Sequence, residues 1–235
     1  MAIQRFYEGV NSVSADNPVG MLPYLDPTTW AVWMEDFVLI PEVTSHWLHT
    51  ATNGTLACTS TGGCGIITQT LAGGDNDLSQ LALKSVTFAL ASGKKMIFET
   101  KVKVDKATGT IGEQELFFGL MTVQTAGDFT DGATLACDNC VGFFSPDGTA
   151  NVHAVVRVAD AESVQTAATT IADVTWTTFS FYFDGTAVQF YKNDTLVAKL
   201  SAFPTAGLCP TLYIKAGEAK ASVLSTDYIL VARER

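Results

Sequence analysis

Charged residues are scarce in this chain of 235 residues, and basic residues are the scarcer kind. Asp, Glu, Lys and Arg make up 16% of the sequence, against about 25% in an average soluble domain. The 14 basic residues are scattered, and the net charge is −10. A surface that binds nucleic acid or an anionic membrane neutralises phosphates with Lys and Arg, so we expect neither partner. Either neighbouring chains cover part of the surface, or it is rich in Thr, Ser, Gly and Ala.

Long apolar runs are missing as well. Residues 1–30 lack the basic start and the apolar stretch of a secretory signal, and Glu8 and Asp16 interrupt them. The longest apolar segments, Val86–Ala91 and Leu116–Val123, have the length of a strand and fall short of the ~18–20 residues of a spanning helix. We therefore expect synthesis and assembly in a cytoplasm.

The cysteines do not form a recognisable framework. Their number is odd, and only Cys137 and Cys140 have C-x-x-C spacing, while Cys58 and Cys64 form a looser pair and Cys209 stands alone. A structural zinc site needs four convergent ligands, usually from two such pairs. Three interpretations stay open for these side chains: free thiols, local disulfides and a metal site.

Other signatures of catalysis or ligand binding are absent or incomplete. The chain has no G-x-S-x-G, no P-loop and no G-x-G-x-x-G. His46, His49 and His153 have no acidic or thiol partner at ligand spacing. Asp75 and Asp77 in one turn are the candidate calcium ligands, and Asp128 and Asp131 form a second acidic turn. Such residues also suit turns that hydrogen-bond their own backbone. We predict no cofactor.

What the chain has in abundance is the two-residue alternation of β-strands. The stretch Trp176–Lys199 alternates, turns at Asp184-Gly185 and again at Asn193-Asp194, and so predicts a hairpin followed by a third strand. The apolar residues of one face are Phe179, Phe181, Phe183, Val188 and Phe190. Their spacing predicts that these side chains point into a core.

Similar signals extend over most of the chain. Met96–Asp105 alternates like a strand with one wet face, and Glu115–Val123 is apolar enough for burial on both faces. Phe37–Ile40 is a short strand candidate, and Ala159–Ala172 suits a short helix or a strand pair equally well. Roughly a dozen strands and no convincing helix predict an all-β fold, a β-sandwich of two antiparallel sheets.

Residues 1–36 differ from the remainder. Pro18, Pro23 and Pro27 exclude a long helix or a central strand there. Large aromatic side chains gain by burial, so we predict an irregular arm over 1–36, packed on its own sheet or on a neighbouring subunit, and one domain over 37–235. In the second case the predicted partner contacts are the aromatic residues Phe6, Tyr7, Tyr24, Trp30 and Trp33.

The central hairpin resembles the closing strands of the concanavalin A-like, laminin-G-like jelly roll. W-x-x-F-x-F-x-F-D-G starts at Trp176 and V-x-F-Y-x-N-D-x-L-V at Val188, although Asp194 stands where the family often has Gly. Further matches are Phe98-Glu99-x-Lys101-Val102, Phe117-Phe118-Gly119-Leu120 and Asp227-Tyr228-Ile229-x-Val231. The resemblance spans about residues 37–235. It implies a jelly roll, a fold that hosts lectins, glycosidases, adhesion modules and virion proteins.

A glycosidase of this fold usually carries E-x-D-x-x-E along one strand, with alternate acids aimed into a groove. The nearest match begins at Glu113-Gln114-Glu115 and lacks the central Asp and the last Glu. We therefore predict a protein that is not an enzyme.

The whole chain also resembles a virion structural protein of a tailed bacteriophage, with its proline-rich arm, single jelly roll and surface rich in Thr, Ala and Gly. This resemblance implies a capsid decoration or cement protein that stabilises the phage head. Its partners would be the major capsid protein and copies of itself in a homotrimer, in a virion assembled in the host cytoplasm. The alternative is a carbohydrate-binding module of a tail fibre that recognises host glycans.

Overall fold

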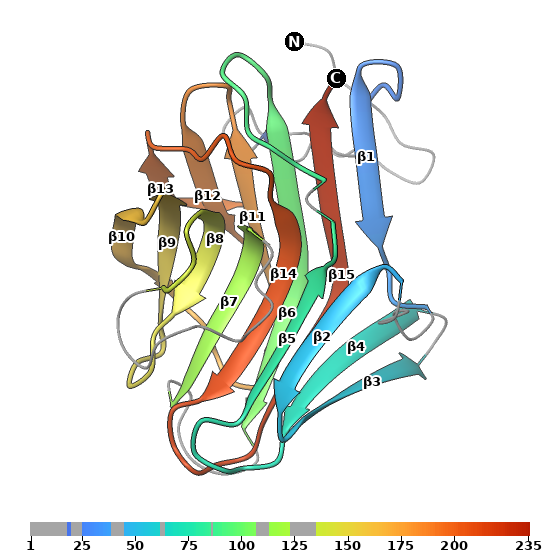
Figure 1. Ribbon diagram of the computed structural model, residues 1–235, viewed down its shortest axis with the longest axis vertical. Helices are drawn as coiled ribbons and strands as arrows, with labels where there is room; N and C mark the ends of the chain where they lie inside the picture. The colour runs from blue at the N-terminus through green and yellow to red at the C-terminus, as the bar shows by residue number, and fades with distance from the viewer. Residues whose placement is uncertain are drawn as a thin grey trace.

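The computed structural model describes residues 18–19, 25–38, 45–61, 64–85, 87–106, 113–122 and 135–235. Its strands form two antiparallel sheets that pack face to face (Figure 1). The predicted all-β sandwich of two antiparallel sheets is therefore confirmed. In the described ranges, no helix has the length and apolar character needed to cross a membrane.

The first sheet has eight strands and contains the predicted hairpin. In spatial order it runs β13-β12-β11-β6-β15-β4-β3, and β1 pairs with the end of β15 that lies beyond β4. The strands are β1 (Trp30–Glu35), β3 (Gly54–Thr61), β4 (Cys64–Leu71), β6 (Met96–Lys106), β11 (Thr177–Phe183), β12 (Val188–Lys192), β13 (Thr195–Leu200) and β15 (Ser222–Glu234).

The second sheet has seven strands, in the order β10-β9-β8-β7-β14-β5-β2. They are β2 (Trp47–Thr52), β5 (Leu78–Leu83), β7 (Gln114–Met121), β8 (Cys140–Ser145), β9 (Asn151–Val158), β10 (Ala161–Thr170) and β14 (Cys209–Ala216). The ambiguous segment after Val158 is thus a strand. Pro210 lies inside β14 opposite Leu120 of β7.

The core lies between the sheets and is rich in phenylalanine. Phe118 of β7 and Phe143 of β8 both contact Phe179 of β11, with ring centres 4.6 and 4.9 Å away. Phe143 also meets Phe190 of β12 edge to face at 5.3 Å. Aromatic pairs at such distances add to the stability gained by burial. The apolar face of the predicted hairpin therefore packs directly against the opposite sheet.

Strand β1 corrects the predicted boundary of the irregular arm. Trp30–Glu35 pairs with β15, from Trp30 opposite Glu234 to Glu35 opposite Ile229 (Figure 1). Phe37, expected to begin a strand, instead follows β1 with a φ of 46°. The three prolines that suggested an irregular segment all precede Trp30, so they do not interrupt this strand. The sheet therefore begins six residues before the end of the predicted arm.

The described part of the N-terminal segment packs on the chain's own sheet, which was one of the two alternatives. Val19 and Trp30 are buried on the outer face of the eight-stranded sheet, where they join Ile97, Tyr182 and Tyr191. Trp33 points the other way, with ring centres 6.0 Å from Trp47 and 6.2 Å from Phe88. These two indoles serve the protein's own fold. Phe6, Tyr7 and Tyr24 lie outside the described residues.

Candidate functional site

The two carboxylates nearest to a glycosidase pair are held by different neighbours. Glu113 precedes β7, and its carboxylate contacts Lys106 Nζ of β6 and lies 3.4 Å from Lys220 Nζ. Glu115 is buried in β7 and lies opposite Lys215 of β14 in the sheet register. Because Glu113 is held by a lysine of the other sheet, the two acids do not present a shared open surface.

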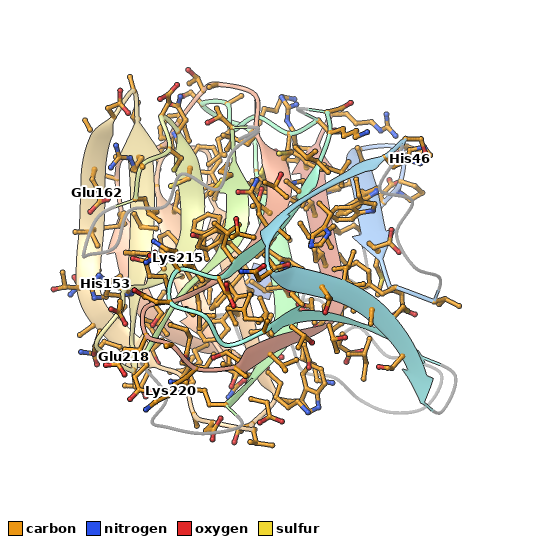
Figure 2. The ribbon with its side chains drawn as sticks, turned by 60° about the horizontal axis from the view of Figure 1, so that its bottom comes forward. His46, His153, Glu162, Lys215, Glu218 and Lys220 are labelled. Carbon is orange, nitrogen blue, oxygen red and sulfur yellow. The ribbon has the colours of Figure 1, made fainter. Side chains whose placement is uncertain are left out.

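The outer face of the seven-stranded sheet is filled by the chain's own side chains. One row in register crosses β5, β14, β7, β8 and β9 and consists of Gln80, Tyr213, Phe117, Phe144 and His153. The first four are at most 1% exposed, and His153 is 9% exposed. Figure 2 shows His153 and Lys215 on this side of the molecule. A sugar chain would therefore find almost no exposed side chain along the row.

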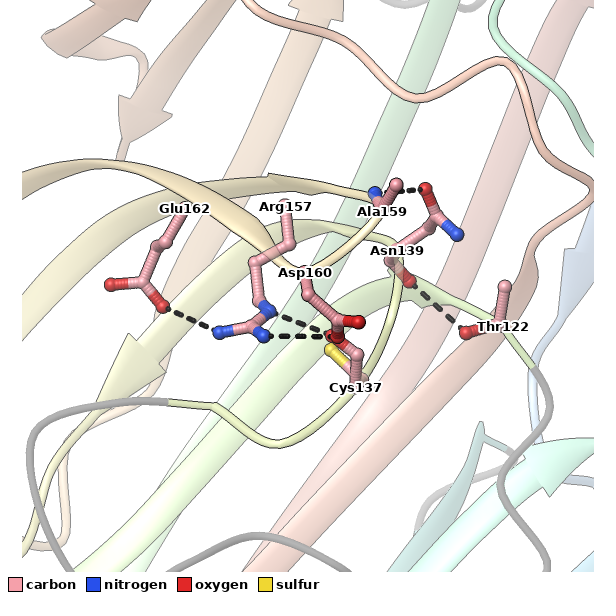
Figure 3. A network of polar contacts seen from close by, with 7 residues as sticks. All are labelled: Thr122, Cys137, Asn139, Arg157, Ala159, Asp160 and Glu162. Carbon is pink, nitrogen blue, oxygen red and sulfur yellow. Dashed lines mark hydrogen bonds and ion pairs between the residues drawn. The ribbon is translucent and has the colours of Figure 1, made fainter.

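Arg157 fastens the segment before β8 to the turn between β9 and β10 (Figure 3). Its Nε donates to the carbonyl oxygen of Cys137 at 2.7 Å, and its terminal nitrogens lie 3.4 Å from Glu162 and 3.3 Å from Asp160. Asn139 tightens the same region through hydrogen bonds with Ala159 and Thr122. The nearly buried guanidinium is thus paired within the fold and has a structural role.

The described cysteines are free thiols, and Cys137, Cys140 and Cys209 are buried. Burial, reinforced by the neighbouring Cys137 thiol, raises the pKa of Cys140. Burial also raises the pKa of Cys209 to about 11. Because the thiolate is the reactive and metal-binding form, these side chains behave as apolar core residues at neutral pH. The side chain of Cys64 lies outside the described residues.

Asp77 has the turn role that was considered for the candidate calcium ligands. Its Oδ2 accepts from the Gly74 backbone N–H at 2.6 Å, and its Oδ1 accepts from Asn53 Nδ2 at 2.9 Å. Asp77 is buried, whereas Asp75 is exposed. Within the described ranges, no group of three or more His, Cys, Asp and Glu side chains converges on a metal position.

The histidines do not form a common site. Figure 2 shows His46 and His153 on opposite sides of the molecule. His49 Nε2 lies 2.9 Å from Ser79 Oγ, and burial lowers the pKa of His49. Ser79 is fully buried and also receives a hydrogen bond from Gln69. A substrate cannot reach a hydroxyl in that position, so this Ser–His pair belongs to the interior.

A tryptophan flanked by two ammonium groups lies on the outer face of the eight-stranded sheet. Trp176 directly precedes β11, whose first residue, Thr177, lies opposite Val102 of β6. Lys101 and Lys103 are alternate residues of β6, so they share that outer face. Their Nζ atoms each lie 5.4 Å from the centre of the Trp176 ring, within the ~6 Å range of a cation–π contact.

Polar groups border this cluster, which we call the Trp176 platform and define as Trp176, Lys101 and Lys103. Lys101 Nζ lies 2.7 Å from Asp227 Oδ2. Lys103 makes no ion pair with any described residue, so the platform has a surplus positive charge.

A carboxyl–phenol pair lies next to the platform. The Tyr228 hydroxyl donates to Glu99 Oε1 at 2.7 Å. Burial raises the pKa of Glu99, although this hydrogen bond acts in the opposite direction. Burial and the nearby Glu99 carboxylate also raise the pKa of Tyr228. The hydrogen-bonding groups beside the platform are therefore held in fixed positions.

The platform combines two properties suited to a sugar. The indole is half-buried, and the part of it that the two ammonium groups leave uncovered can pack against the C–H groups of a sugar ring. The ammonium groups can donate hydrogen bonds to hydroxyl or acidic groups. Lys101 and Lys103 lie on the wet face predicted for Met96–Asp105, but no pattern in the sequence connects them with Trp176. Only the pairing of β6 with β11 brings them together.

No family model matches this sequence, and no curated protein matches it either. Among solved structures, the chain is similar to the endo-1,3-beta-glucanase from Streptomyces sioyaensis. That similarity has a TM-score of 0.61 and 12% sequence identity, and it covers 89% of this chain and 98% of the glucanase.

Two further structures share the architecture. The carbohydrate recognition domain of Emp47p has a TM-score of 0.58 at 11% identity, with 88% of this chain and 98% of that domain covered. A protein of unknown function from Shewanella oneidensis MR-1 has a TM-score of 0.56 at 14% identity, with 88% and 87% covered. These similarities confirm the concanavalin A-like jelly roll. They concern the fold alone, and none of them points to a phage particle.

Proposed function

We propose that this protein is a non-enzymatic carbohydrate-binding module that holds its ligand at the Trp176 platform. The main support for this site is that Lys101 Nζ and Lys103 Nζ both lie over the half-buried indole of Trp176. The concanavalin A-like fold supports a carbohydrate ligand, because proteins with that fold include a carbohydrate recognition domain and a glucanase.

We propose that the protein lacks glycosidase activity because of the positions of Glu113 and Glu115. Retaining and inverting glycosidases both need two carboxyl groups that flank the scissile bond. Glu113 is engaged by Lys106 and Lys220, and Glu115 is buried opposite Lys215. The next residue on the face of Glu115 is the apolar Phe117. We expect no release of reducing ends from β-1,3-glucan or mixed-linkage glucan. Release by the parent protein that is lost in a Glu115→Gln, Glu113→Gln double variant would overturn the proposed absence of catalysis.

A glycan array tests ligand binding directly. We expect the protein to bind a set of glycans and the Trp176→Ala variant to lose about tenfold or more in affinity, because a central aromatic contact of this kind is worth at least 1–2 kcal/mol. Lys192→Ala is the matched control, since this lysine lies on the same sheet and donates to the Thr170 carbonyl, away from Trp176. Equal affinity of the Trp176→Ala and parent proteins would overturn the proposed site.

The same array with EDTA separates two kinds of site. The platform uses an indole and ammonium groups, so chelation should leave binding unchanged. Binding that disappears with EDTA would contradict the platform and would direct attention to the loop of Asp75 and Asp77.

A second candidate function is capsid decoration in a tailed phage, with the major capsid protein and further copies of this chain as partners. One observation favours such an assembly role: β1 presents Val32 and Met34 at 50% and 52% exposure. Contiguous exposed apolar surface marks interaction sites, and these two side chains are neighbours on one face of β1. The test is occupancy of the protein on purified phage heads, compared between the parent and a Val32→Lys, Met34→Lys variant. Undiminished occupancy of the variant would argue against this role of β1.

A further inference from the structure

Strand β1 is an edge strand with one unused side. It pairs with β15, and no other described strand pairs with it. Edge strands present backbone N–H and C=O groups that another chain can pair with. Lysine or proline within such a strand discourages pairing, but the sequence of β1 is Trp-Ala-Val-Trp-Met-Glu and contains neither.

The hydrogen-bond pattern identifies the residues that face the unused side. The Arg235 N–H donates to the Thr29 carbonyl at 2.9 Å, next to the Trp30–Glu234 pair. In an antiparallel pair, hydrogen-bonded and non-hydrogen-bonded positions alternate. Ala31, Trp33 and Glu35 therefore direct their backbone groups to β15. Val32 and Met34 direct theirs to the unused side.

The side chains at these two positions are exposed as well. Trp30, Val32 and Met34 share the outer face of β1, and Trp30 is covered there while Val32 and Met34 are about half exposed. The same two residues thus offer unused backbone groups and open apolar side chains. An interaction by strand addition requires this combination, because backbone bonds give affinity and alternate side chains give specificity.

The two ends of β1 differ in charge. Glu35 and Asp36 lie at its C-terminal end. At its N-terminal end, Arg235 Nε donates to the Trp30 carbonyl at 3.3 Å, and Lys94 Nζ donates to the Arg235 carbonyl. Glu234 also lies at this end, opposite Trp30, but it is paired with Lys95 at 3.7 Å, so Arg235 and Lys94 leave the end basic. A second copy that approaches antiparallel brings its acidic end to this basic end, and the reverse contact forms at the same time.

We propose that two copies of this chain associate through their β1 strands, antiparallel and about a two-fold axis that passes beside Trp33. In this register Val32 of each copy forms a hydrogen-bonded pair with Met34 of the other, and Asp36 of each copy lies opposite Trp30, near Arg235. The four side chains at positions 32 and 34 form one apolar strip. The contact is isologous and by itself builds a dimer. It does not depend on the proposed glycan binding.

Cysteine cross-linking tests the register. Residues in a hydrogen-bonded antiparallel pair have Cα atoms about 5.5 Å apart, which a disulfide can bridge. The Val32→Cys, Met34→Cys double variant of the full chain should form a covalent dimer under mild oxidation. Each single variant should stay monomeric on a non-reducing gel, because position 32 meets position 34 and not itself. Cross-linking of a single variant would overturn the register.

Val174→Cys is the matched control, since Val174 is 55% exposed and lies outside β1. It should not cross-link. A double variant at 32 and 34 that cross-links no faster than this control would overturn the proposed pairing altogether.

A charge exchange gives an independent test in solution. Mass measured by light scattering over a concentration series should show dimers for the parent, monomers for Asp36→Arg, and restored dimers for Asp36→Arg combined with Arg235→Asp. A parent protein that stays monomeric throughout the series would overturn the proposal. So would an Asp36→Arg variant that dimerises like the parent.

Discussion

At the scale of single residues, Gly119 and Gly142 are paired across β7 and β8, and neither position has room for a side chain. A Cβ at Gly119 would lie 2.4 Å from the Val141 carbonyl oxygen and 2.7 Å from the Gly142 Cα. Both neighbours are backbone atoms, which cannot move aside as a side chain can. We expect Gly119→Ala to lower the free energy of unfolding by roughly 1–3 kcal/mol. Urea unfolding measures this, and an unchanged midpoint would contradict the close packing.

Asp184 provides a pH-dependent contribution at the turn of the central hairpin. Its Oδ1 accepts from the Thr186 N–H at 2.8 Å, the Thr186 hydroxyl at 2.7 Å and the Ala187 N–H at 2.8 Å. Partial burial by itself would raise the pKa of Asp184, but these hydrogen bonds outweigh it and hold the pKa below its ordinary value of 3.8. The folded state therefore favours the carboxylate.

We expect Asp184→Ala to lose about 1–2 kcal/mol of stability at neutral pH. A lowered pKa means that this contribution is fully present above the ordinary value of 3.8 and is lost as the pH falls through the lower pKa of the folded state. The difference between parent and variant in urea unfolding should therefore shrink below that pH. Asp184→Asn is the control, because it keeps the Oδ1 acceptor without the charge. A difference that stays constant down to low pH would refute the role of the carboxylate.

The residues of the candidate site show where sequence reasoning ends. The short spacing of Glu113 and Glu115 could be read from the sequence, and so could the missing acid at the end of the motif. Lys106 is only seven residues from Glu113 but lies on the other sheet. Lys220, which also pairs with Glu113, and Lys215, which lies opposite Glu115, are about a hundred residues further on, so their approach depends on the arrangement of the strands. The Trp176 platform could not be predicted from the sequence either, because it depends on the pairing of β6 with β11.

At the scale of elements, β1 determines the consequence of removing the N-terminal segment. We expect a chain that lacks residues 1–35 to be several kcal/mol less stable than one that lacks residues 1–29, since the loss of a buried Trp costs about 3–5 kcal/mol. The shorter chain loses Trp30 and Trp33, and with Trp33 the ring contacts to Trp47 and Phe88. Thermal and urea unfolding of the two chains measure the difference.

The same two truncated chains also matter for any experiment that tests whether the N-terminal segment binds a partner. Reduced binding of a chain without residues 1–35 would mix the loss of a contact with the loss of a strand. The chain that lacks only residues 1–29 keeps β1 and is the proper comparison. Equal stability of the two truncated chains would show that β1 contributes little to the sandwich.

Strands could be predicted where one face alternates or where a short run is wholly apolar, as in β6, β7 and β11. The order of the strands within each sheet could not be predicted, because it depends on contacts between segments that are distant in the sequence. The identity of β10 was open, since its sequence of Ala, Thr and Val suits both conformations. In the structure β10 pairs with β9, with a bulge between Gln165 and Thr169, and that pairing determines its conformation.

At the scale of the whole molecule, the net charge controls how easily copies meet. The net charge is −10 at pH 7, and the sequence pI is near 4.6. We expect self-association to increase as the pH approaches that value, because long-range repulsion between copies disappears there. Light scattering across a pH series measures this effect. Scattering that stays flat between neutral pH and the pI would contradict it.

The fold as a whole was accessible from the sequence because two-residue periodicity and turn residues agree over nearly the entire chain. The function was less accessible, since the same sandwich carries unrelated activities on its surface. Surface sites depend on side chains from several strands. The predicted virion role, homotrimer and capsid partner rest on a resemblance of the whole chain, and they remain proposals.

The position of β15 has a consequence for synthesis. This strand is the last of the described strands, yet β6 lies on one side of it and both β4 and β1 lie on the other. At a translation rate of about 5–20 residues per second, β1 leaves the ribosome on the order of ten seconds before its partner exists. During that interval Trp30 and Trp33 have no sheet to pack on. A ribosome that stalls before Ser222 would therefore release a chain whose eight-stranded sheet lacks the strand between its two halves, and such a product is a natural substrate for chaperones and proteases.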